Sequence, residues 1–330
     1  MKALVYVNPY ELVLRDEADP SPEPGEALIR IRAAAVCGSD MHGYHGADAR
    51  RKPPLILGHE AAGEVVSGAL EGQRVVLNPL VTCGVCPACT GGRANLCPDR
   101  RLIGMARPGA FAELITLPER NLIPVPDGMT LSHAALTEPA ATALHGINLA
   151  QRAAFRAFAE ASVLVIGGGA IGLLSALILR WQGCRDITVA ETNPRRRQMI
   201  QGTSVGRVMD PVSDGQPQTD HYDLVVDAVG IGATRDTAVA AVAPGDVILH
   251  LGLGESRSEM DARKLTLGEI TFVGCYTYTP VDLRASLAAL HGGALGDLTW
   301  IEERPLAEGA AVFSALDAGE LAAGKVVLRP

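Results

Sequence analysis

The stretch that decides the fold of this chain is Val163-Leu-Val-Ile-Gly-Gly-Gly-Ala-Ile-Gly172, which an apolar, leucine-rich run follows. The β-branched residues before the glycines favour a strand, and the run after them favours a buried helix. The glycines fit G-x-G-x-x-G, in which the first makes a tight turn, the second admits a pyrophosphate, and the third lets helix and strand pack closely. We therefore expect a dinucleotide to bind at Gly167, Gly169, Ala170, Ile171 and Gly172.

A carboxylate follows the next predicted strand. Glu191 lies roughly 20 residues beyond Gly172, where an acidic residue binds the adenosine ribose diol and repels the 2′-phosphate of NADP. The segment Asn193-Pro-Arg-Arg-Arg197 indicates an N-cap, a proline at the first helical position and three cations, which the helix dipole disfavours. Either solvent screens these charges, or they contact the adenosine end of the cofactor, with Arg196 the candidate. NAD is the favoured cofactor, and NADP is the alternative.

Composition and charge exclude several classes of protein. The chain has 330 residues, 48% of them apolar, which indicates a globular protein of about two domains. Its net charge of -8 argues against nucleic acid or an anionic membrane as the main partner. Residues 161–179 are uncharged and long enough to cross a bilayer, but the clustered glycines argue for strand, turn and helix instead. The first ten residues are too short an apolar run for a secretory signal, so we expect a cytoplasmic protein.

The texture of the sequence changes along the chain. Up to about residue 130, short alternating runs at 2–7, 26–33, 73–77 and 109–117 predict a mostly-β domain. From about residue 160, apolar runs at 163–166, 187–190, 207–209, 224–227, 247–251 and 270–273 alternate with helical segments and predict a doubly wound parallel sheet. The run 325–329 is a strand that could rejoin the first domain. The expected division is 1–143, 144–277 and a returning segment 278–330.

Four of the seven cysteines crowd into one short segment in the pattern C-x2-C-x2-C-x7-C. In a reducing compartment, such a group closes tetrahedrally around a structural Zn²⁺. An iron-sulfur cluster is a weaker alternative because the last gap is seven rather than three, and free thiols are another. The expected ligands are Cys83, Cys86, Cys89 and Cys97, while Cys184 and Cys275 fit small buried hydrophobes.

A seventh cysteine opens the segment Cys37-Gly-Ser-Asp-Met-His42, which places a thiol, a hydroxyl, a carboxylate and an imidazole within six residues. Together with the preceding motifs, this segment resembles the zinc-dependent medium-chain alcohol dehydrogenases, particularly their sorbitol and threonine dehydrogenase branch. The likeness covers nearly the whole chain, and its further elements are Gly58-His-Glu60, Glu138-Pro139, Asp227-Ala-Val-Gly230 and Pro244-Gly245. It implies a GroES-like catalytic domain, a Rossmann domain, two zinc ions per chain, and a homodimer or homotetramer.

The resemblance also assigns roles to residues. Cys37, His59 and Glu138 would hold a catalytic zinc, with an open fourth position as such sites have. Glu60 would lie behind these ligands or exchange with them, since adjacent residues of an extended segment point to opposite sides. Ser39 is similar to the family's relay hydroxyl and His42 to its terminal base, while Asp40 would orient the loop. Tyr44 and His45 either reach the substrate or are solvated loop residues.

The implied reaction is hydride transfer between a small secondary alcohol, most of all a polyol or sugar alcohol, and NAD. L-threonine or another amino alcohol is the second candidate. The sorbitol branch has an Arg-Tyr pair after its last Rossmann strand, and this chain has Thr277 where the arginine would be. A zinc-free quinone reductase or a non-catalytic binding protein on the same fold would lack the zinc ligands or the relay.

Overall fold

The computed structural model describes residues 1–321 and 323–330, which group into two units. Unit 1 comprises Met1–Pro139, Thr279–Gly292 and Ile301–Pro330, and unit 2 comprises Ala140–Tyr278 and Gly293–Trp300. Whether 1–143, 144–277 and 278–330 behave as folding domains stays a prediction. None of the helices in the described residues is both long and apolar enough to span a bilayer.

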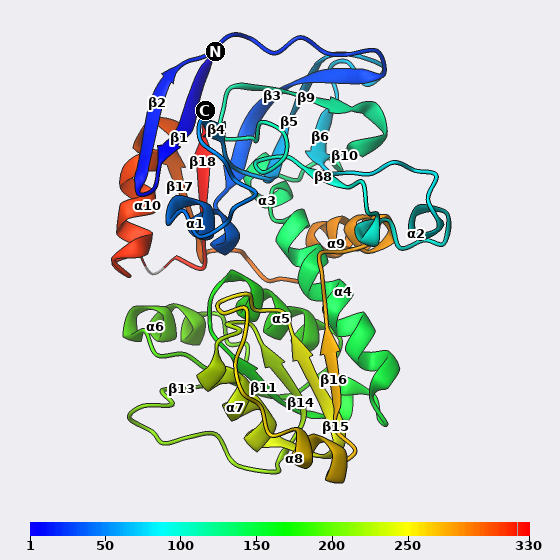
Figure 1. The fold of residues 1–330 in the computed structure, drawn as a ribbon, viewed down its shortest axis with the longest axis vertical. Coiled ribbons are helices and arrows are strands. Elements are labelled where there is room, and N and C mark those ends of the chain that lie inside the picture. The colour runs from blue at the N-terminus through cyan, green and yellow to red at the C-terminus, as the bar shows by residue number, and fades with distance from the viewer. Residues whose placement is uncertain (322) are drawn as a thin grey trace. The chain divides into compact units, whose positions relative to one another are not determined.

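Unit 1 is mostly β (Figure 1). Its seven-stranded sheet has the order β10-β6-β5-β3-β18-β17, and β9 also pairs with β3. A three-stranded sheet, β2-β1-β4, and a two-stranded one, β7-β8, accompany it. The bounds are β1 Lys2–Asn8, β2 Glu11–Asp16, β3 Glu26–Ala35, β4 Leu55–Ile56, β5 Glu60–Ser67, β6 Arg74–Leu77, β7 Leu80–Val81, β8 Arg101–Leu102, β9 Leu114–Pro118, β10 Leu122–Pro124, β17 Ile301–Pro305 and β18 Lys325–Arg329.

The helices of unit 1 are four to twelve residues long. They are α1 Gly38–Tyr44, α2 Pro87–Thr90, α3 Leu131–Ala134, α9 Pro280–His291 and α10 Gly309–Asp317, with 3-10 turns η1 Ala94–Leu96, η2 Glu119–Asn121 and η4 Leu306–Glu308. The core between these elements includes Tyr6, Phe111 and Phe313, each at most 1% exposed. Along the first half of β3, the buried Ala27, Ile29 and Ile31 alternate with more exposed residues, so this part of the strand buries one face on the core.

The expected strand at 109–117 is wrong in its first half. The strand β9 begins only at Leu114. The backbone before it instead bonds to the segment that precedes β5, with Gly109 N donating to Ile56 O at 2.8 Å and Phe111 N to Leu57 O at 3.0 Å. These two hydrogen bonds, which no local sequence pattern indicates, fix the backbone just ahead of His59.

Unit 2 is a parallel sheet of the order β13-β12-β11-β14-β15-β16, the order of a doubly wound dinucleotide-binding sheet. The predicted fold class, a mostly-β unit plus a doubly wound parallel sheet, is therefore confirmed. The bounds are β11 Ser162–Ile166, β12 Asp186–Ala190, β13 Arg207–Met209, β14 Tyr222–Asp227, β15 Val242–His250, β16 Thr271–Gly274, α4 Thr137–Ala153, η3 Phe158–Glu160, α5 Ala170–Trp181, α6 Pro194–Gly202, α7 Gly232–Ala241 and α8 Ala262–Leu267, with the first residues of α4 in unit 1.

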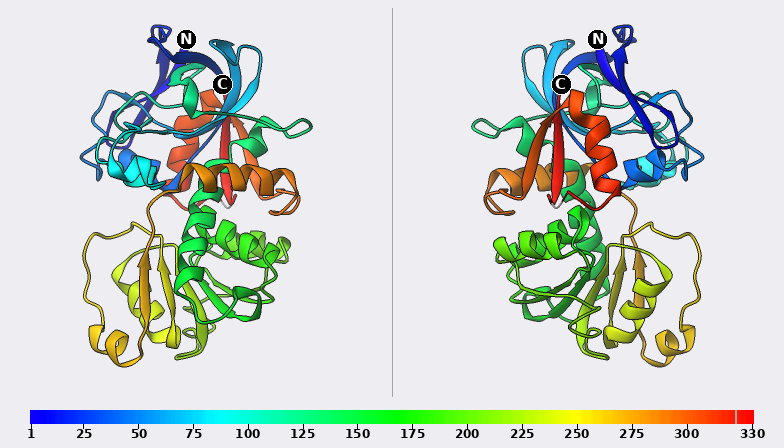
Figure 2. Two further views of the ribbon diagram at one scale, coloured as in Figure 1. Left: turned by 90° about the vertical axis from the view of Figure 1, so that its right-hand side faces the viewer. Right: turned by 90° about the vertical axis from the view of Figure 1, so that its left-hand side faces the viewer.

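The last part of the chain returns to unit 1, as the sequence predicts for 325–329. The strand β18 pairs in parallel with β17 and antiparallel with β3. Figure 2 shows this red strand among the blue and cyan strands from the beginning of the chain. The return places Lys325, at the start of β18, beside residues of α1 and β5.

Candidate active site

Three potential metal ligands meet at the start of α1 and β5. One ligand atom each of Cys37, His59 and Glu60 lies within 4.8 Å of the other two. We call these residues the inner cluster. Cys37 is the N-cap of α1, and His59 and Glu60 are 4% and 0% exposed. Sulfur, nitrogen and oxygen donors brought together in a buried position suit a catalytic zinc.

Asp40 orients two members of the inner cluster, as its expected role in the loop requires. One carboxylate oxygen accepts a 3.0 Å hydrogen bond from Cys37 N, and the other lies 3.4 Å from His59 Nδ1. A histidine ligand commonly turns its second ring nitrogen toward a carboxylate in this way. Burial lowers the pKa of His59, but Asp40 and Cys37 outweigh burial and raise this pKa well above its usual value. The sulfur, nitrogen and oxygen donors, with the Asp40 carboxylate behind His59, fit a zinc site.

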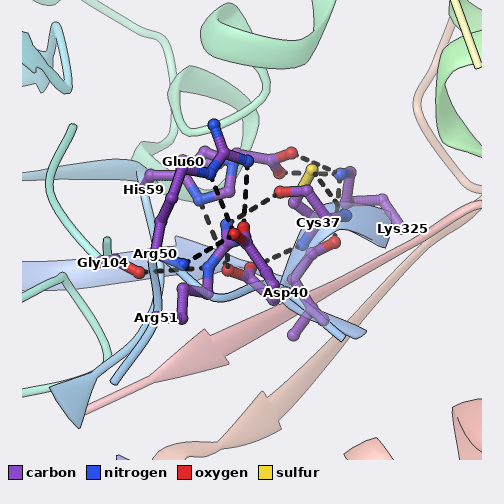
Figure 3. A network of polar contacts seen from close by, with 11 residues as sticks. Cys37, Asp40, Arg50, Arg51, His59, Glu60, Gly104 and Lys325 are labelled. Atoms are coloured by element: carbon purple, nitrogen blue, oxygen red, sulfur yellow. Dashed lines mark hydrogen bonds and ion pairs between the residues drawn. The ribbon is translucent and has the colours of Figure 1, made fainter. Parts of the chain in front are cut away.

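Glu60 is held by a lysine that sequence reasoning missed. Lys325 Nζ lies 2.8 and 2.7 Å from the two Glu60 carboxylate oxygens and 3.0 Å from Val36 O (Figure 3). Lys325 is 3% exposed. Burial lowers its pKa, but Glu60 and Cys37 outweigh burial and keep this pKa above its usual value. The signal in the sequence was a single lysine opening an apolar strand, which does not reveal its partner.

Glu138 lies in the first turn of α4, is 6% exposed, and contributes to the charge around Lys325. It is not one of the three residues whose ligand atoms lie within 4.8 Å of one another. Its role as the third zinc ligand therefore stays a prediction, with Glu60 in the nearer position.

The proposed relay residues share the helix that Cys37 caps. Ser39 N lies 3.5 Å from Cys37 Sγ, and Ser39 and His42 are three residues apart on α1, so they share one helical face. Burial lowers the pKa of His42, and the charge of Arg51 lowers it further. The lowered pKa favours the neutral imidazole at neutral pH, which leaves one ring nitrogen without a proton.

Tyr44 and His45 have structural partners. Tyr44 is 6% exposed and packs against Phe313, with ring centroids 5.5 Å apart. His45 Nε2 lies 2.6 Å from Asp317 Oδ1 of α10. These contacts favour the interpretation that both residues fix the C-terminal end of α1.

The four-cysteine segment forms a second cluster, which we call the outer cluster: Cys83, Cys86, Cys89 and Cys97, with one sulfur each mutually within 4.8 Å. Cys83 Sγ lies 3.9 Å from Cys89 Sγ and 3.6 Å from Cys97 Sγ, and all four thiols are free. Tetrahedral zinc with Zn–S of 2.3 Å places sulfurs about 3.8 Å apart. Backbone N–H groups of Val85 and Cys86 lower the pKa of Cys83 to about 7, which favours the thiolate that zinc binds.

The glycine turn of unit 2 has the expected form. Gly167 has φ +92°, and a Cβ at Gly172 would lie 1.8 Å from Gly167 O. At Gly169, by contrast, a Cβ would meet nothing within 4 Å. Ala170 and Ile171 begin α5, whose N-cap, Gly169, makes no side-chain cap. Open space over uncapped N–H groups is what a pyrophosphate requires.

Glu191 is 6% exposed and accepts hydrogen bonds from Gly168 N at 2.8 Å and Asn193 N at 2.7 Å. It is therefore fixed beside the glycine turn. The predicted N-cap Asn193 is confirmed, since its side chain accepts from Arg195 N and Arg196 N. The Arg196 side chain is half-buried in the first turn of α6.

Comparisons with known proteins agree with this geometry. Residues 23–127 match the model for the alcohol dehydrogenase GroES-like domain, and residues 170–291 match that for zinc-binding dehydrogenases. The chain is 32% identical over 295 residues to L-galactonate-5-dehydrogenase of Escherichia coli (strain K12), covering 86% of this chain and 85% of that protein. It is 32% identical over 350 residues to L-threonine 3-dehydrogenase of Chelativorans sp. (strain BNC1), covering 99% and 98%.

A similar solved structure is that of a zinc-binding dehydrogenase from Sinorhizobium meliloti 1021 bound to NADP, with 27% identity and a TM-score of 0.85. The alignment covers 100% of this chain and 99% of that one. The two family models fall on the two units that hold the metal-type clusters and the glycine turn. The chain thus belongs to the zinc-dependent medium-chain alcohol dehydrogenases, oxidoreductases that act on CH–OH groups with a nicotinamide cofactor.

Proposed function

We propose that this enzyme oxidises a secondary alcohol, most of all a polyol or sugar alcohol, with NAD. The observation that carries the proposal is that potential ligand atoms of Cys37, His59 and Glu60 lie close together. Cys37 also caps helix α1, which holds Ser39 and His42. Bound zinc supplies a Lewis acid that lowers the pKa of an alcohol, and bound NAD supplies the hydride acceptor. The chain itself must hold the ligands in place and carry the proton away.

Each residue has a defined task in this proposal. Cys37 and His59 hold the metal, Asp40 orients His59, and Glu60 with Glu138 completes or exchanges with the ligand set. Ser39 accepts the alcohol proton, and His42 passes it to solvent, which its lowered pKa allows near neutral pH. Cys83, Cys86, Cys89 and Cys97 hold a second, structural zinc.

A spectrophotometric screen tests the proposal. Polyols, sugar acids with secondary hydroxyls, simple secondary alcohols and L-threonine are offered in turn with NAD and NADP, and the reduced nicotinamide is measured. We expect the highest kcat/KM with a polyol or a sugar acid. A higher value for L-threonine would select the alternative that the second relative suggests.

Metal analysis separates the enzyme from other proteins on this fold. Two zinc ions per chain support the proposal, whereas one would leave only the outer cluster loaded and indicate a zinc-free reductase or a binding protein. Rapid oxidation of NADPH by a quinone, without any alcohol activity, would identify the reductase.

The cofactor preference is proposed to depend on Glu191, whose fixed carboxylate would bind the ribose diol and repel a 2′-phosphate. One solved relative is bound to NADP and another, acetophenone reductase from Geotrichum candidum, is in complex with NAD. Glu191→Ala should reduce the ratio of kcat/KM for NAD to that for NADP by about tenfold, one lost charge-assisted contact. Arg196→Ala should leave kcat/KM for NAD almost unchanged and should lower kcat/KM for NADP. An unchanged ratio in Glu191→Ala would remove this residue from cofactor selection.

We further propose a homo-oligomer, a dimer or a tetramer, in the cytoplasm. Within the described residues, β16 ends the sheet of unit 2 with β15 as its neighbour, and Phe272 on it is 37% exposed. An open strand edge with apolar side chains is a site for pairing with another chain. Free cysteines throughout fit a reducing compartment. Sedimentation equilibrium measures the subunit number.

A further inference from the structure

Arg51 is a buried arginine beside the proposed proton relay. Its side chain is 1% exposed, and it lies on the loop between α1 and β4. Its guanidinium makes contacts in three directions: Nη1 donates to Asp48 Oδ2 at 2.6 Å, Nε donates to Gly104 O at 3.3 Å, and Nη2 donates to Ser39 Oγ at 3.1 Å. Figure 3 shows Arg51 beside Asp40 and Gly104. The contacts with Asp48 and Gly104 would be sufficient to hold the loop in place. The third contact, with Ser39, reaches the proposed proton relay.

The backbone of α1 makes room for this arginine. A Cβ at Gly43 would lie 2.5 Å from Arg51 Cδ, so the stem of Arg51 passes directly over a position without a side chain. Asp40 Oδ1, which faces His59, also lies 3.8 Å from Arg51 Nη2. The same guanidinium therefore faces both the hydroxyl and the carboxylate of the site, with its charge balanced by Asp40 and Asp48.

We propose that Arg51 is a positioning residue that sets the direction of the proton relay. This inference rests on the proposed function, in which Ser39 accepts the alcohol proton. A guanidinium has donors and no acceptor, so Ser39 Oγ must accept from it, and the serine hydrogen is left to point elsewhere. One lone pair of Ser39 Oγ then accepts the hydrogen bond from Arg51, and the other is free to accept the alcohol proton. The serine hydrogen is free to be passed on.

The proton transfer balances without any change in Arg51. Bound NAD would supply the acceptor for the hydride, and the hydroxyl proton of the alcohol would move to the free lone pair of Ser39 Oγ. The original serine hydrogen leaves at the same time toward His42 and solvent. Ser39 ends as a neutral hydroxyl, and Arg51 keeps all its protons while its hydrogen bond to Oγ holds the hydroxyl in the direction that the relay needs.

Three variants test the proposal with zinc-loaded protein and the best alcohol from the screen. Arg51→Met should lower kcat roughly 100-fold, the range that a positioned proton-transfer group contributes, with KM for the alcohol and NAD within threefold. Arg51→Lys, which keeps the charge but loses the planar fork, should lower it by about tenfold. Lys52→Met is the matched control, since it removes an exposed cation from the same loop, and its kcat should stay unchanged.

Two readouts distinguish positioning from a structural role. In Arg51→Met the solvent deuterium isotope effect on kcat should rise, because proton transfer becomes slower. In the background of Ser39→Ala, Arg51→Met should cause less than a twofold further loss, because both changes remove the same step. Losses that multiply would overturn the proposal, as would a wild-type kcat in Arg51→Met.

A further measurement does not depend on turnover. The unfolding midpoints of Arg51→Met, Ser39→Ala and the double variant are compared, and the shifts should not add, because the two side chains share one hydrogen bond. Additive shifts would overturn the contact itself. If the wild type oxidises no alcohol with either nicotinamide, the proposed function fails and the relay role of Arg51 fails with it. Non-additive midpoints would in that case preserve the contact alone.

Discussion

The inner and outer clusters of unit 1 differ in the groups that surround their cysteine sulfurs. The outer cluster has four thiols, three of them half-buried. Backbone N–H groups lower the pKa of Cys83, which favours the thiolate that a cation binds. The inner cluster uses one thiol and relies on buried charges: Asp40 beside His59, Lys325 on Glu60, and Arg51 beside both Asp40 and Ser39. The proposed structural site is built from one short segment, whereas the proposed catalytic site draws its support from α1, the loop before β4, β5 and β18.

The largest contrast is expected in activity. Cys37→Ala removes the sulfur of the inner cluster, so turnover should fall at least about 1,000-fold, the scale of losing a metal that supplies several kcal/mol. NAD binding and far-UV circular dichroism should stay as in the wild type. Cys184→Ala, a buried cysteine outside both clusters, is the control. Wild-type turnover by Cys37→Ala would refute the ligand assignment.

The next contrast concerns stability. Lys325→Met leaves the Glu60 carboxylate buried without its cation, which should cost about 3–5 kcal/mol in the free energy of unfolding, measured by urea denaturation. Glu60→Gln combined with Lys325→Met should recover most of this loss, because neither member of this pair then carries a buried charge. If the double variant is as unstable as the single one, packing of the lysine stem and not its charge is responsible.

The outer cluster should respond differently. Cys89→Ser should reduce the zinc content from two ions per chain to one and lower the melting temperature by about 5 °C, since bound metal contributes folding energy. The kcat per remaining inner zinc should change less than threefold. A loss of activity as large as that of Cys37→Ala would show that the two clusters are not independent.

The smallest effect concerns pH. Burial raises the pKa of Asp48, but hydrogen bonds and charge from Arg50, with the charge of Arg51, outweigh burial and hold this pKa at about 2, below the usual 3.8. A carboxyl with a lowered pKa stabilises the fold above its unfolded-state pKa, and this contribution is lost as the pH falls from about 4 through about 2. The stability difference between wild type and Asp48→Asn, measured in urea, should therefore shrink below pH 4. A difference that stays constant from pH 6 to pH 3 would contradict this role.

The sequence predicted most of what local chemistry determines. The strand, turn and helix around Gly167, the parallel sheet, and the grouping of the four cysteines all depend on neighbours in the chain, so spacing was sufficient. Lys325 and Arg51 were missed because their roles depend on partners far along the chain or across a loop. The same reason explains the strand placed too early before Leu114, where an alternating pattern gave no sign that the backbone bonds to Ile56 and Leu57 instead.

The return of the last strand has a consequence for the biosynthesis of this protein. Glu60 emerges from the ribosome 265 residues before the lysine that neutralises it. Until Lys325 has been synthesised, this carboxylate has no lysine partner, so the Glu60–Lys325 pair forms only when β18 is inserted between β3 and β17. A chain that stops before β18 could therefore contain the glycine turn and the parallel sheet, yet it would lack the lysine that holds Glu60 in the inner cluster.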